Sequence, residues 1–393
     1  CSHDPSVWYQ FTTSANVGQT ISVNIDATGG GLDAYCAIYT DPGNCNTLND
    51  LVQINDGSAF PNAFGQSDVT VDITCPSPNT TYWIQVDGLD VTGADGTFNV
   101  NISDNNIQSG AHDLICNAFN MGTLNIGGNL GNNNFNNFCS GTQPGEPNPS
   151  AFGIDQTQWF TFTTGANIGT EVTIEALNDP LNRGDQIDLQ VALYTSSNGT
   201  CTGSFSEIDS DYFTPPFGET MTTNCLQPNT TYFVQVDGSG LNTQGFFGLS
   251  ISDNGIPQAS NDDICNAISI GQIPFGGSQT NNNMNNFCAT IATGEPNSPG
   301  CLYGIDQTIW VTFTTGAQVG WEMTIAAVSD PLNQGDAIDL QAALYTSSNG
   351  TCTGSLTAVD CDYDPDVPLF ETGEDLVVEC LQPNTTYLVQ LDG

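Results

Sequence analysis

Four carboxylates alternate with other residues near the end of the chain, at Asp360, Asp362, Asp364 and Asp366. This spacing lets several oxygen atoms surround one hard cation, and Ca²⁺ typically takes about six to eight oxygen ligands in proteins. The segment lacks the glycine and the distal glutamate of an EF-hand loop, so a solvated acidic loop is the competing interpretation. We predict a candidate calcium site at these four residues and no other cofactor.

The 14 cysteines are the second group with a chemistry of their own. Only two histidines are present, and neither stands at a recurring cysteine spacing, which favours disulfides over a metal cluster. Disulfides indicate an oxidising, extracellular compartment. Because several cysteines recur at corresponding places of a repeated sequence, we pair them within each repeat and assign the rest by elimination. The predicted disulfides are Cys45–Cys75, Cys201–Cys225, Cys352–Cys380, Cys116–Cys139, Cys265–Cys288, Cys301–Cys361 and Cys1–Cys36.

Asparagine and tryptophan side chains are candidates for contact with sugars. Trp8, Trp159 and Trp310 stand in equivalent sequences, where an exposed ring would stack on a sugar and a covered ring would belong to a core or an interface. We favour the covered position. Six asparagines each begin an Asn-x-Ser/Thr triplet and are candidate glycosylation sites, namely Asn79, Asn101, Asn198, Asn229, Asn349 and Asn384.

Composition excludes several classes of function. The 393 residues contain 43 Asp and Glu against a single Lys or Arg, which gives a formal charge of −42. A chain without a basic surface cannot neutralise phosphates, so we expect neither nucleic acid nor an anionic membrane as a direct partner. Catalytic motifs such as Gly-x-Ser-x-Gly, His-Glu-x-x-His or a phosphate-binding loop do not occur in the sequence. We predict that the chain is not an enzyme.

A repeat of about 150 residues organises these groups. Trp-x-x-Phe-Thr-Thr occurs at residues 8–13, 159–164 and 310–315, so successive tryptophans are 151 residues apart, and Pro-Asn-Thr-Thr-Tyr recurs later in each unit. We place the units at residues 1–104, 105–254 and 255–393, with the first and the last incomplete. The simplest interpretation is a window on a longer array. The alternative is that the two ends complete each other between subunits.

Within a unit, apolar residues alternate with polar ones, which predicts strands with one buried and one wet face. Glycine, proline and asparagine clusters separate the strands, and no amphipathic helix is evident. We predict an all-β fold, a tandem array of antiparallel jelly-roll β-sandwich domains stapled by disulfides. The predicted inward positions of the middle unit are Phe160, Phe162, Val172, Ile174, Leu189, Val191, Leu193, Tyr232, Val234, Val236, Phe247, Leu249 and Ile251.

The order of motifs resembles a known domain type. Asp-x-x-Cys-Asn-Ala at residues 113–118 and 262–267 is followed by the Trp-Phe-Thr-Phe-Thr-Thr motif, by Ala-Leu-Tyr and by Pro-Asn-Thr-Thr-Tyr-x-Val-Gln-Val-Asp-Gly. The pattern is similar to tandem jelly-roll repeats of the bacterial pre-peptidase C-terminal type, found in large surface and secreted proteins exported by type IX secretion. The resemblance implies stalks of adhesins, filaments or accessory modules. Neither a sorting domain nor a catalytic domain of such proteins is present in the sequence.

We therefore expect an extracellular or cell-surface protein that forms part of a filament or an adhesin stalk, with neighbouring repeats or subunits as its partners. The alternative is an array of calcium-dependent carbohydrate-binding modules of a secreted protein, with surface glycans as partners. The first hypothesis follows from the repeats, the charge and the lack of catalytic residues, and the second from the loop carboxylates and the tryptophans.

Overall fold

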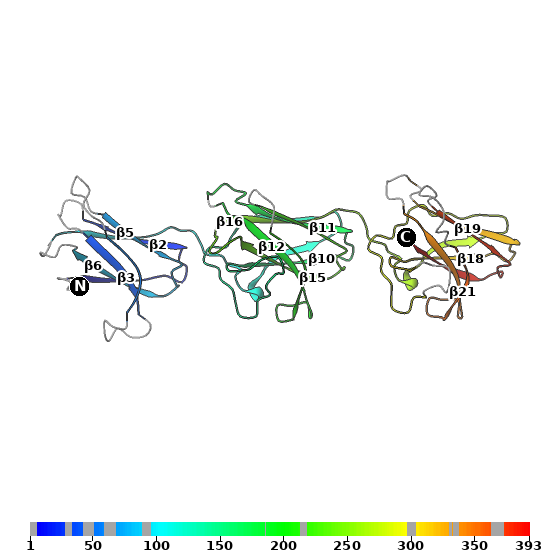
Figure 1. The fold of residues 1–393 in the computed structure, drawn as a ribbon, viewed down its shortest axis with the longest axis horizontal. Coiled ribbons are helices and arrows are strands. Elements are labelled where there is room, and N and C mark those ends of the chain that lie inside the picture. Colours follow the sequence, from blue (N-terminus) through cyan, green and yellow to red (C-terminus); the bar gives the residue numbers. More distant parts are fainter. Residues whose placement is uncertain are drawn as a thin grey trace.

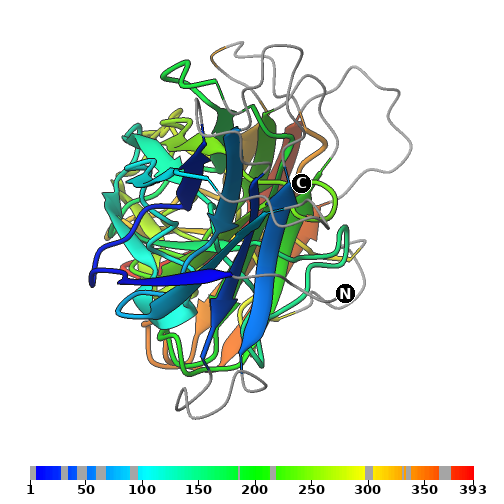
Figure 2. The same ribbon diagram turned by 90° about the vertical axis from the view of Figure 1, so that its left-hand side faces the viewer.

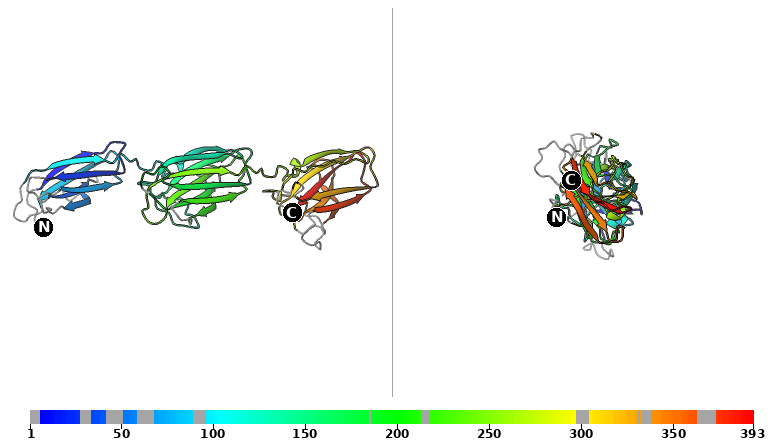
Figure 3. Two further views of the ribbon diagram at one scale, coloured as in Figure 1. Left: turned by 90° about the horizontal axis from the view of Figure 1, so that it is seen from above. Right: turned by 90° about the vertical axis from the view of Figure 1, so that its right-hand side faces the viewer.

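The computed structural model describes residues 6–27, 34–41, 51–58, 68–88, 96–184, 186–212, 218–296, 304–329, 332, 338–362 and 373–393. They form three bodies of β-sheet in a row along the longest axis (Figure 1), and a short connecting segment joins each body to the next (Figure 3). We call these bodies the first, second and third sandwich. The described residues include the 3-10 helices Ile115–Asn117 and Ile264–Asn266, and no helix among them is long and apolar enough to cross a membrane.

The first sandwich has sheets of order β1-β6-β3-β4 and β5-β2-β7. Its hydrophobic cluster lies between the two sheets, and Figure 2 looks along the row from this end. Its strands are β1 (Val7–Thr12), β2 (Thr20–Asp26), β3 (Ala34–Thr40), β4 (Val52–Ser58), β5 (Asp68–Thr74), β6 (Thr81–Gly88) and β7 (Asn99–Asp104).

The second sandwich has a five-stranded sheet, β13-β12-β15-β10-β8, facing a four-stranded sheet, β14-β11-β16-β9. Its strands are β8 (Phe119–Leu124), β9 (Asn129–Asn136), β10 (Gln158–Thr164), β11 (Glu171–Asn178), β12 (Leu189–Ser196), β13 (Phe205–Asp211), β14 (Glu219–Asn224), β15 (Thr231–Gly238) and β16 (Phe246–Asp253).

The third sandwich has a five-stranded sheet, β17-β18-β23-β20-β21, and among its described residues a second sheet that contains only β19 and β22. The two strands that would correspond to β9 and β16 are not formed by its described residues. Its strands are β17 (Ile268–Ile273), β18 (Ile309–Thr315), β19 (Glu322–Val328), β20 (Gln341–Ser347), β21 (Leu356–Asp362), β22 (Gly373–Glu379) and β23 (Thr386–Asp392).

The all-β fold is confirmed, but its sheets are not purely antiparallel. β8 pairs in parallel with β10, and β17 pairs in parallel with β18. For β8 and β10 the reason is the path of the chain, because β9, on the opposite sheet, lies between them in sequence. Two strands of one sheet that are separated by a strand of the other sheet return to their sheet in the same direction.

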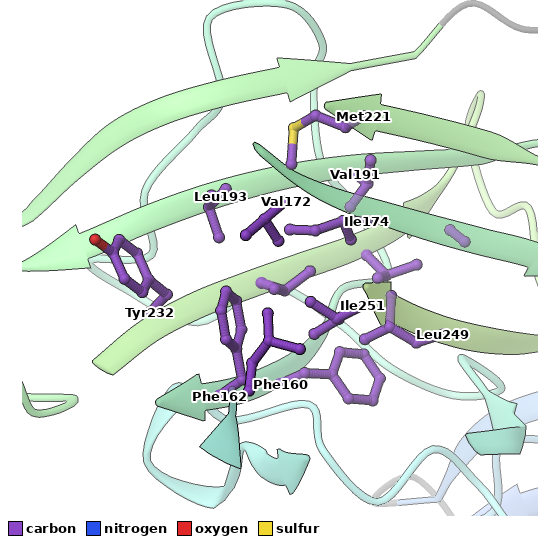
Figure 4. Close-up of a cluster of buried hydrophobic side chains, with 14 of the residues drawn as sticks. Phe160, Phe162, Val172, Ile174, Val191, Leu193, Met221, Tyr232, Leu249 and Ile251 are labelled. Atoms are coloured by element: carbon purple, nitrogen blue, oxygen red, sulfur yellow. The ribbon is translucent and has the colours of Figure 1, made fainter. Parts of the chain in front are cut away.

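The core of the second sandwich confirms the predicted alternation. Every inward position predicted for this unit belongs to one buried cluster between the two sheets, and Figure 4 shows part of it. Phe160 and Phe162 enter from β10 and face Val172 and Ile174 of β11, all with at most 1% of their surface exposed. Burying such side chains supplies the main driving force for folding, about 1.5–3 kcal/mol each.

The repeated tryptophans lie on the opposite face of the same sheet. Trp159 and Trp310 are fully buried in smaller clusters outside the main cores, each next to a tyrosine, Tyr194 or Tyr345. The covered position that we favoured is therefore correct for these two rings, and they cannot stack on a sugar. Trp8 in the first sandwich is only partly buried.

Candidate functional site at the junctions between sandwiches

Each junction between sandwiches is closed by a disulfide. Cys75 of the first sandwich bonds Cys139 of the second, and Cys225 of the second bonds Cys288 of the third. The two bonds have nearly equal sequence separations, 64 and 63 residues. Closing a loop of this length in the unfolded chain stabilises the folded state by about 4 kcal/mol on the chain-entropy model. The cysteines therefore fix neighbours to each other as well as stabilising the fold.

The same backbone geometry presents the sulfur at both junctions. Cys75 and Cys225 have φ of 53° and 58°, a left-handed conformation that turns the chain sharply after β5 and β14. The Cys75 amide donates to the Gln19 carbonyl at 2.8 Å, and the Cys225 amide donates to the Thr170 carbonyl at 2.9 Å. Each turn is thus held against the residue that precedes β2 or β11.

The linker after β7 is bound to the sandwich that it leaves. The Gln19 amide donates to the Ile107 carbonyl at 2.6 Å, and the Asn105 amide donates to the Thr20 carbonyl at 3.0 Å. Asp104 accepts from the Gly18 amide at 2.8 Å. The linker therefore continues the sheet edge and does not swing freely.

The linker after β16 repeats these contacts. The Thr170 amide donates to the Ile256 carbonyl at 2.8 Å, and the Asn254 amide donates to the Glu171 carbonyl at 3.1 Å. The Asp253 carboxylate accepts from three backbone amides, those of Gly127, Gly169 and Gly255, at 2.6, 2.6 and 2.8 Å. A carboxylate with this many amide donors makes strong, charge-assisted hydrogen bonds.

Two glycines make room for these carboxylates. A Cβ atom on Gly18 would lie 2.1 Å from an oxygen of Asp104, and one on Gly169 would lie 2.5 Å from an oxygen of Asp253. No side chain fits at either position while the linker is in place. The Asp-Asn pair that ends β7 and β16 and the glycine before β2 and β11 thus form one repeated clasp.

The second pair of disulfides lies within the second and the third sandwich. Cys116 bonds Cys201, and Cys265 bonds Cys352, and each bond ties the 3-10 helix before the edge strand to a distant turn. Our pairings were therefore wrong for Cys45–Cys75, Cys116–Cys139, Cys201–Cys225, Cys265–Cys288 and Cys352–Cys380. They failed because a partner in the same repeat and one in the next repeat recur with the same period.

Two described cysteines are free, contrary to prediction. Cys36 is buried in the core of the first sandwich with 0% exposure, so the predicted Cys1–Cys36 bond is also wrong. Burial raises the pKa of the Cys36 thiol to about 12, which makes it inert. Cys380 is free and exposed. Cys361 is disulfide-bonded, while Cys1, Cys45 and Cys301 lie outside the described residues, so the Cys301–Cys361 bond stays a prediction.

The candidate calcium ligands are only partly described. Asp360 and Asp362 lie two positions apart on β21, and the Cys361 amide donates to the Asp360 carboxylate at 3.0 Å. Asp364 and Asp366 lie outside the described residues. Among the residues that are described, no group of three or more candidate ligands comes together. The calcium site therefore stays a prediction.

All six asparagines of the glycosylation triplets are exposed. Three of them occupy the same left-handed turn before β6, β15 and β23, with φ of 52°, 52° and 48°. Two others sit in the turn after β12 and β20, and the last is on β7. Exposure permits modification of each one, and the glycans stay a prediction. In the order described, these residues are Asn79, Asn229, Asn384, Asn198, Asn349 and Asn101.

A buried polar clamp went unpredicted. The indole Nε1 of Trp159 donates to Glu146 Oε1 at 2.7 Å, and Gln235 Nε2 donates to the same oxygen at 3.2 Å. Trp310 and Glu295 repeat the first contact at 2.8 Å. These glutamates stand in the recurring sequence Gly-Glu-Pro-Asn at residues 145–148 and 294–297, which was the available signal. The clamp holds a loop over the outer face of the sheet.

One buried carboxyl carries an unusual pKa. Asp237, at the end of β15, has 1% of its surface exposed, and its burial raises the pKa to about 6. Backbone amides of Asp155 and Gln156 donate to it at 2.9 and 3.0 Å and oppose this shift. The group fastens the segment before β10 to the sheet. The nearby Asp155 carboxylate adds to the rise in this pKa.

The side chain of Arg183 makes its contacts within the second sandwich. Its guanidinium lies 3.6 Å from the ring centroid of Phe246 and donates to Asn134 Oδ1 at 2.6 Å. Its Nε is 3.7 Å from Asp179 Oδ1, which is too long for a hydrogen bond. The hydrogen bond from the Arg183 backbone is the main cause that lowers the pKa of Asp179. This arrangement stabilises a loop of the second sandwich.

Comparisons with known proteins identify no family. No family model matches the chain, and no curated protein resembles its sequence. An uncharacterised protein from Burkholderia cenocepacia is 11% identical, with 63% of this chain and 76% of that chain covered and a TM-score of 0.18. Recombinant N-glycanase F is 11% identical, with 64% and 89% covered and a TM-score of 0.20. The CBM32-1 and CBM32-2 domains of Clostridium perfringens ZmpB, in complex with GalNAc, are 8% identical, with 62% and 76% covered and a TM-score of 0.15. Scores this low carry no argument about fold or function.

Proposed function

We propose that this chain is a structural, non-enzymatic part of an extracellular filament or adhesin stalk, built from tandem jelly-roll sandwiches. The observation that carries the proposal is the pair of disulfides between successive sandwiches, Cys75–Cys139 and Cys225–Cys288. A domain that only binds a ligand gains little from a covalent bond to its neighbour, whereas a rod gains a fixed spacing. The linkers support the proposal, because backbone hydrogen bonds hold them against the sandwich that they leave.

The disulfides also shorten the covalent path through the second sandwich. From Cys75 the path crosses to Cys139, runs back along the backbone to Cys116, crosses to Cys201 and runs on to Cys225. Fully extended, this path spans at most about 17 nm, whereas the backbone alone from Cys75 to Cys225 would span about 54 nm. Under tension, the stretch from Cys75 to Cys225 therefore reaches only about a third of its backbone length before covalent bonds resist. This is the property that a stalk or filament exposed to flow requires.

The charge of the chain fits an extracellular position and a self-associating array. At −42, with no lysine, neighbouring subunits repel each other unless cations or glycans intervene. We propose calcium for this role, bound at Asp360, Asp362, Asp364 and Asp366, and neighbouring repeats or subunits as the partners. Differential scanning calorimetry with Ca²⁺, Mg²⁺ and chelator tests the metal. A melting temperature that is the same in all three solutions removes calcium from the proposal.

The alternative function is an array of calcium-dependent carbohydrate-binding modules, and the structure removes the main reason for it. The Trp159 and Trp310 rings, which would have formed a stacking platform, are fully buried. No other observation on the described residues favours this alternative. Binding on a broad glycan array that requires Ca²⁺ would nevertheless establish it in place of the stalk.

The decisive experiment compares the shape of the oxidised chain with that of a matched variant. The variant Cys75→Ser/Cys139→Ser/Cys225→Ser/Cys288→Ser lacks both junction disulfides and keeps Cys116–Cys201 and Cys265–Cys352. Small-angle X-ray scattering and negative-stain electron microscopy are expected to show a straight rod of three beads for the parent and a wider range of bead angles for the variant. A parent chain that is as bent as the variant would contradict the proposal.

A further inference from the structure

The geometry points to an acceptor site on the third sandwich, formed by the open edge of β19, Gly320, Trp321 and Cys380, for a segment of the same kind as residues 246–288. This segment consists of a strand, an Asp-Asn clasp, a linker and a cysteine turn. It would be bound by strand pairing and then joined to Cys380 by a disulfide. The inference rests on the proposed function as an array and assigns the next attachment point of that array.

Cys380 has the geometry of the two cysteines that are bonded to a following sandwich. Its φ is 56°, compared with 53° for Cys75 and 58° for Cys225. Its amide donates to the Trp321 carbonyl at 3.0 Å, as the other two donate to Gln19 and Thr170. The thiol is exposed, and no described residue bonds it. The third cysteine is therefore already held in the conformation from which the first two make their bonds.

The strand edge beside this cysteine is open. β2 pairs with β5 and β7, and β11 pairs with β14 and β16, whereas β19 pairs only with β22 among the described residues. Because one neighbour is missing, Met323 and Ile325 are only partly buried, while the corresponding Val172 and Ile174 of β11 have 1% and 0% exposure. An extended segment with alternating apolar side chains would complete both the sheet and the core.

Gly320 of the third sandwich stands at the position of the clasp glycines Gly18 and Gly169, and the space beside it is free for an incoming carboxylate. A Cβ atom on Gly320 would meet nothing closer than the Glu322 carbonyl at 3.4 Å, whereas Gly18 and Gly169 are covered by a carboxylate of the following linker. Trp321, which follows this glycine, is 71% exposed. Its amide makes no hydrogen bond with a described residue, while the amides of the corresponding Gln19 and Thr170 donate to linker carbonyls.

The occupant is defined by the two junctions that the chain itself forms. At the second junction, β16 pairs with β11, Asp253 accepts from the Gly169 amide, and Cys288 bonds Cys225. The bonded cysteines of the incoming segments, Cys139 and Cys288, both follow Asn-Asn-Phe and have φ of 59° and 60°. We commit to such a segment of a further repeat as the occupant.

The covalent step is an ordinary thiol–disulfide exchange. The Cys380 thiolate attacks a mixed disulfide between the incoming cysteine and glutathione, forms the new S–S bond and releases glutathione as thiolate, which takes up the proton lost by Cys380. Two sulfurs are joined and two are separated, so no other oxidant is required. Strand pairing raises the local concentration of the incoming cysteine and so favours this bond over others.

The test uses the whole oxidised chain and a synthetic peptide of residues 246–290 in which Cys265→Ser leaves Cys288 as the single thiol. Both are equilibrated in a glutathione buffer, and mass spectrometry measures the mixed disulfide at Cys380. We expect the native peptide to form about tenfold or more mixed disulfide with Cys380 than a scrambled peptide of the same composition. One or two backbone hydrogen bonds supply a factor of this size. The emission of Trp321 should shift to the blue, and a Trp321→Phe variant identifies that signal.

Gly320→Ala is the decisive variant. It should fold as the parent does, because its Cβ has room, and it should lose the preference for the native peptide, because the methyl group would occupy the place of the incoming aspartate carboxylate. Circular dichroism verifies the fold. A native peptide that reacts no better than the scrambled one, or a Gly320→Ala chain that retains the preference, overturns the inference. Small-angle scattering from the chain alone tests the rod shape separately. The proposed function can therefore fail while this acceptor site is confirmed, and the acceptor site can fail while the rod is confirmed.

Discussion

Removing the disulfide inside the second sandwich should lengthen the mechanically unfolded chain by a defined amount. In the oxidised parent, the shortest covalent path from Cys75 to Cys225 uses both the Cys75–Cys139 and the Cys116–Cys201 bond. A fully extended residue spans at most about 3.6 Å, so this path reaches about 17 nm. Without the Cys116–Cys201 bond, the path follows the backbone from Cys139 to Cys225 and reaches about 31 nm.

The Cys116→Ser/Cys201→Ser chain should therefore extend about 14 nm further than the parent. The Cys75→Ser/Cys139→Ser chain provides a matched comparison. Its shortest path follows the backbone from Cys75 to Cys116, crosses to Cys201 and continues to Cys225. This path reaches about 23 nm, so the variant should extend about 6 nm further than the parent.

The assay is single-molecule force spectroscopy, with both ends of the chain tethered and the contour length measured after all sandwiches have unfolded. The parent in reducing buffer is the control, because it must give the longest chain of all. Variants that unfold at lower force but reach the same final length would show that the bond stabilises without shortening the path. Equal gains for the two variants, or no gain for either, would refute the disulfide connectivity and with it the mechanical argument.

Three further predictions concern single groups. Because burial raises the folded-state pKa of Asp237 to about 6, its contribution to the free energy of unfolding should fall by about 3 kcal/mol as the pH rises from about 4 to about 6 and stay level above. In urea titrations, Asp237→Asn should flatten this pH dependence. A slope of the opposite sign would mean that the amide hydrogen bonds to Asp237 outweigh its burial. Glu146→Ala should lower the free energy of unfolding by about 1–3 kcal/mol, because it leaves the buried Trp159 indole N–H without an acceptor, and Glu146→Gln should lower it less. Equal losses of stability in thermal unfolding would exclude that cause. Iodoacetamide should label Cys380 in the folded chain and Cys36 only after denaturation, and mass spectrometry that finds both labelled at one rate would contradict the burial of Cys36.

The fold was largely predictable because its strongest signal is local. Phe160, Phe162, Val172 and Ile174 alternate with polar residues, and alternation alone decides which face of a strand is buried. The same rule placed Trp159 on the opposite face of the sheet. The parallel edge strand β8 was not predictable in this way, because its direction depends on the path through β9 on the other sheet.

The disulfides were mispredicted for a different reason. Cys75, Cys116 and Cys139 recur with one period, so recurrence cannot distinguish a partner in the same unit from one in the next. Elimination then favoured the pairing that used every cysteine. The structure leaves Cys380 free, which is what a bond to the next unit requires. The assumption that recurring cysteines pair within one unit was therefore the source of the five wrong pairs, and the assumption that no thiol stays free added the wrong Cys1–Cys36 pair.

The junction clasp was visible in the sequence but was not interpreted. An Asp-Asn pair ends β7 and β16, at Asp104 and Asp253, and we used it only to mark boundaries. Its role depends on contact with Gly18 and Gly169, about 85 residues earlier, and no local pattern reveals a partner at that distance. Repetition of a polar pair at a strand end is the signal that would have found it.

The order in which the disulfides overlap also determines where a protease can sever the molecule. A single backbone cut between Cys75 and Cys201, or between Cys225 and Cys352, is spanned by at least one of the four described disulfides and leaves the pieces joined. The stretch from Cys201 to Cys225 is spanned by none of them. None of these four bonds rejoins the pieces after a nick in this stretch, whereas after a cut in either spanned region at least one of them keeps the pieces together.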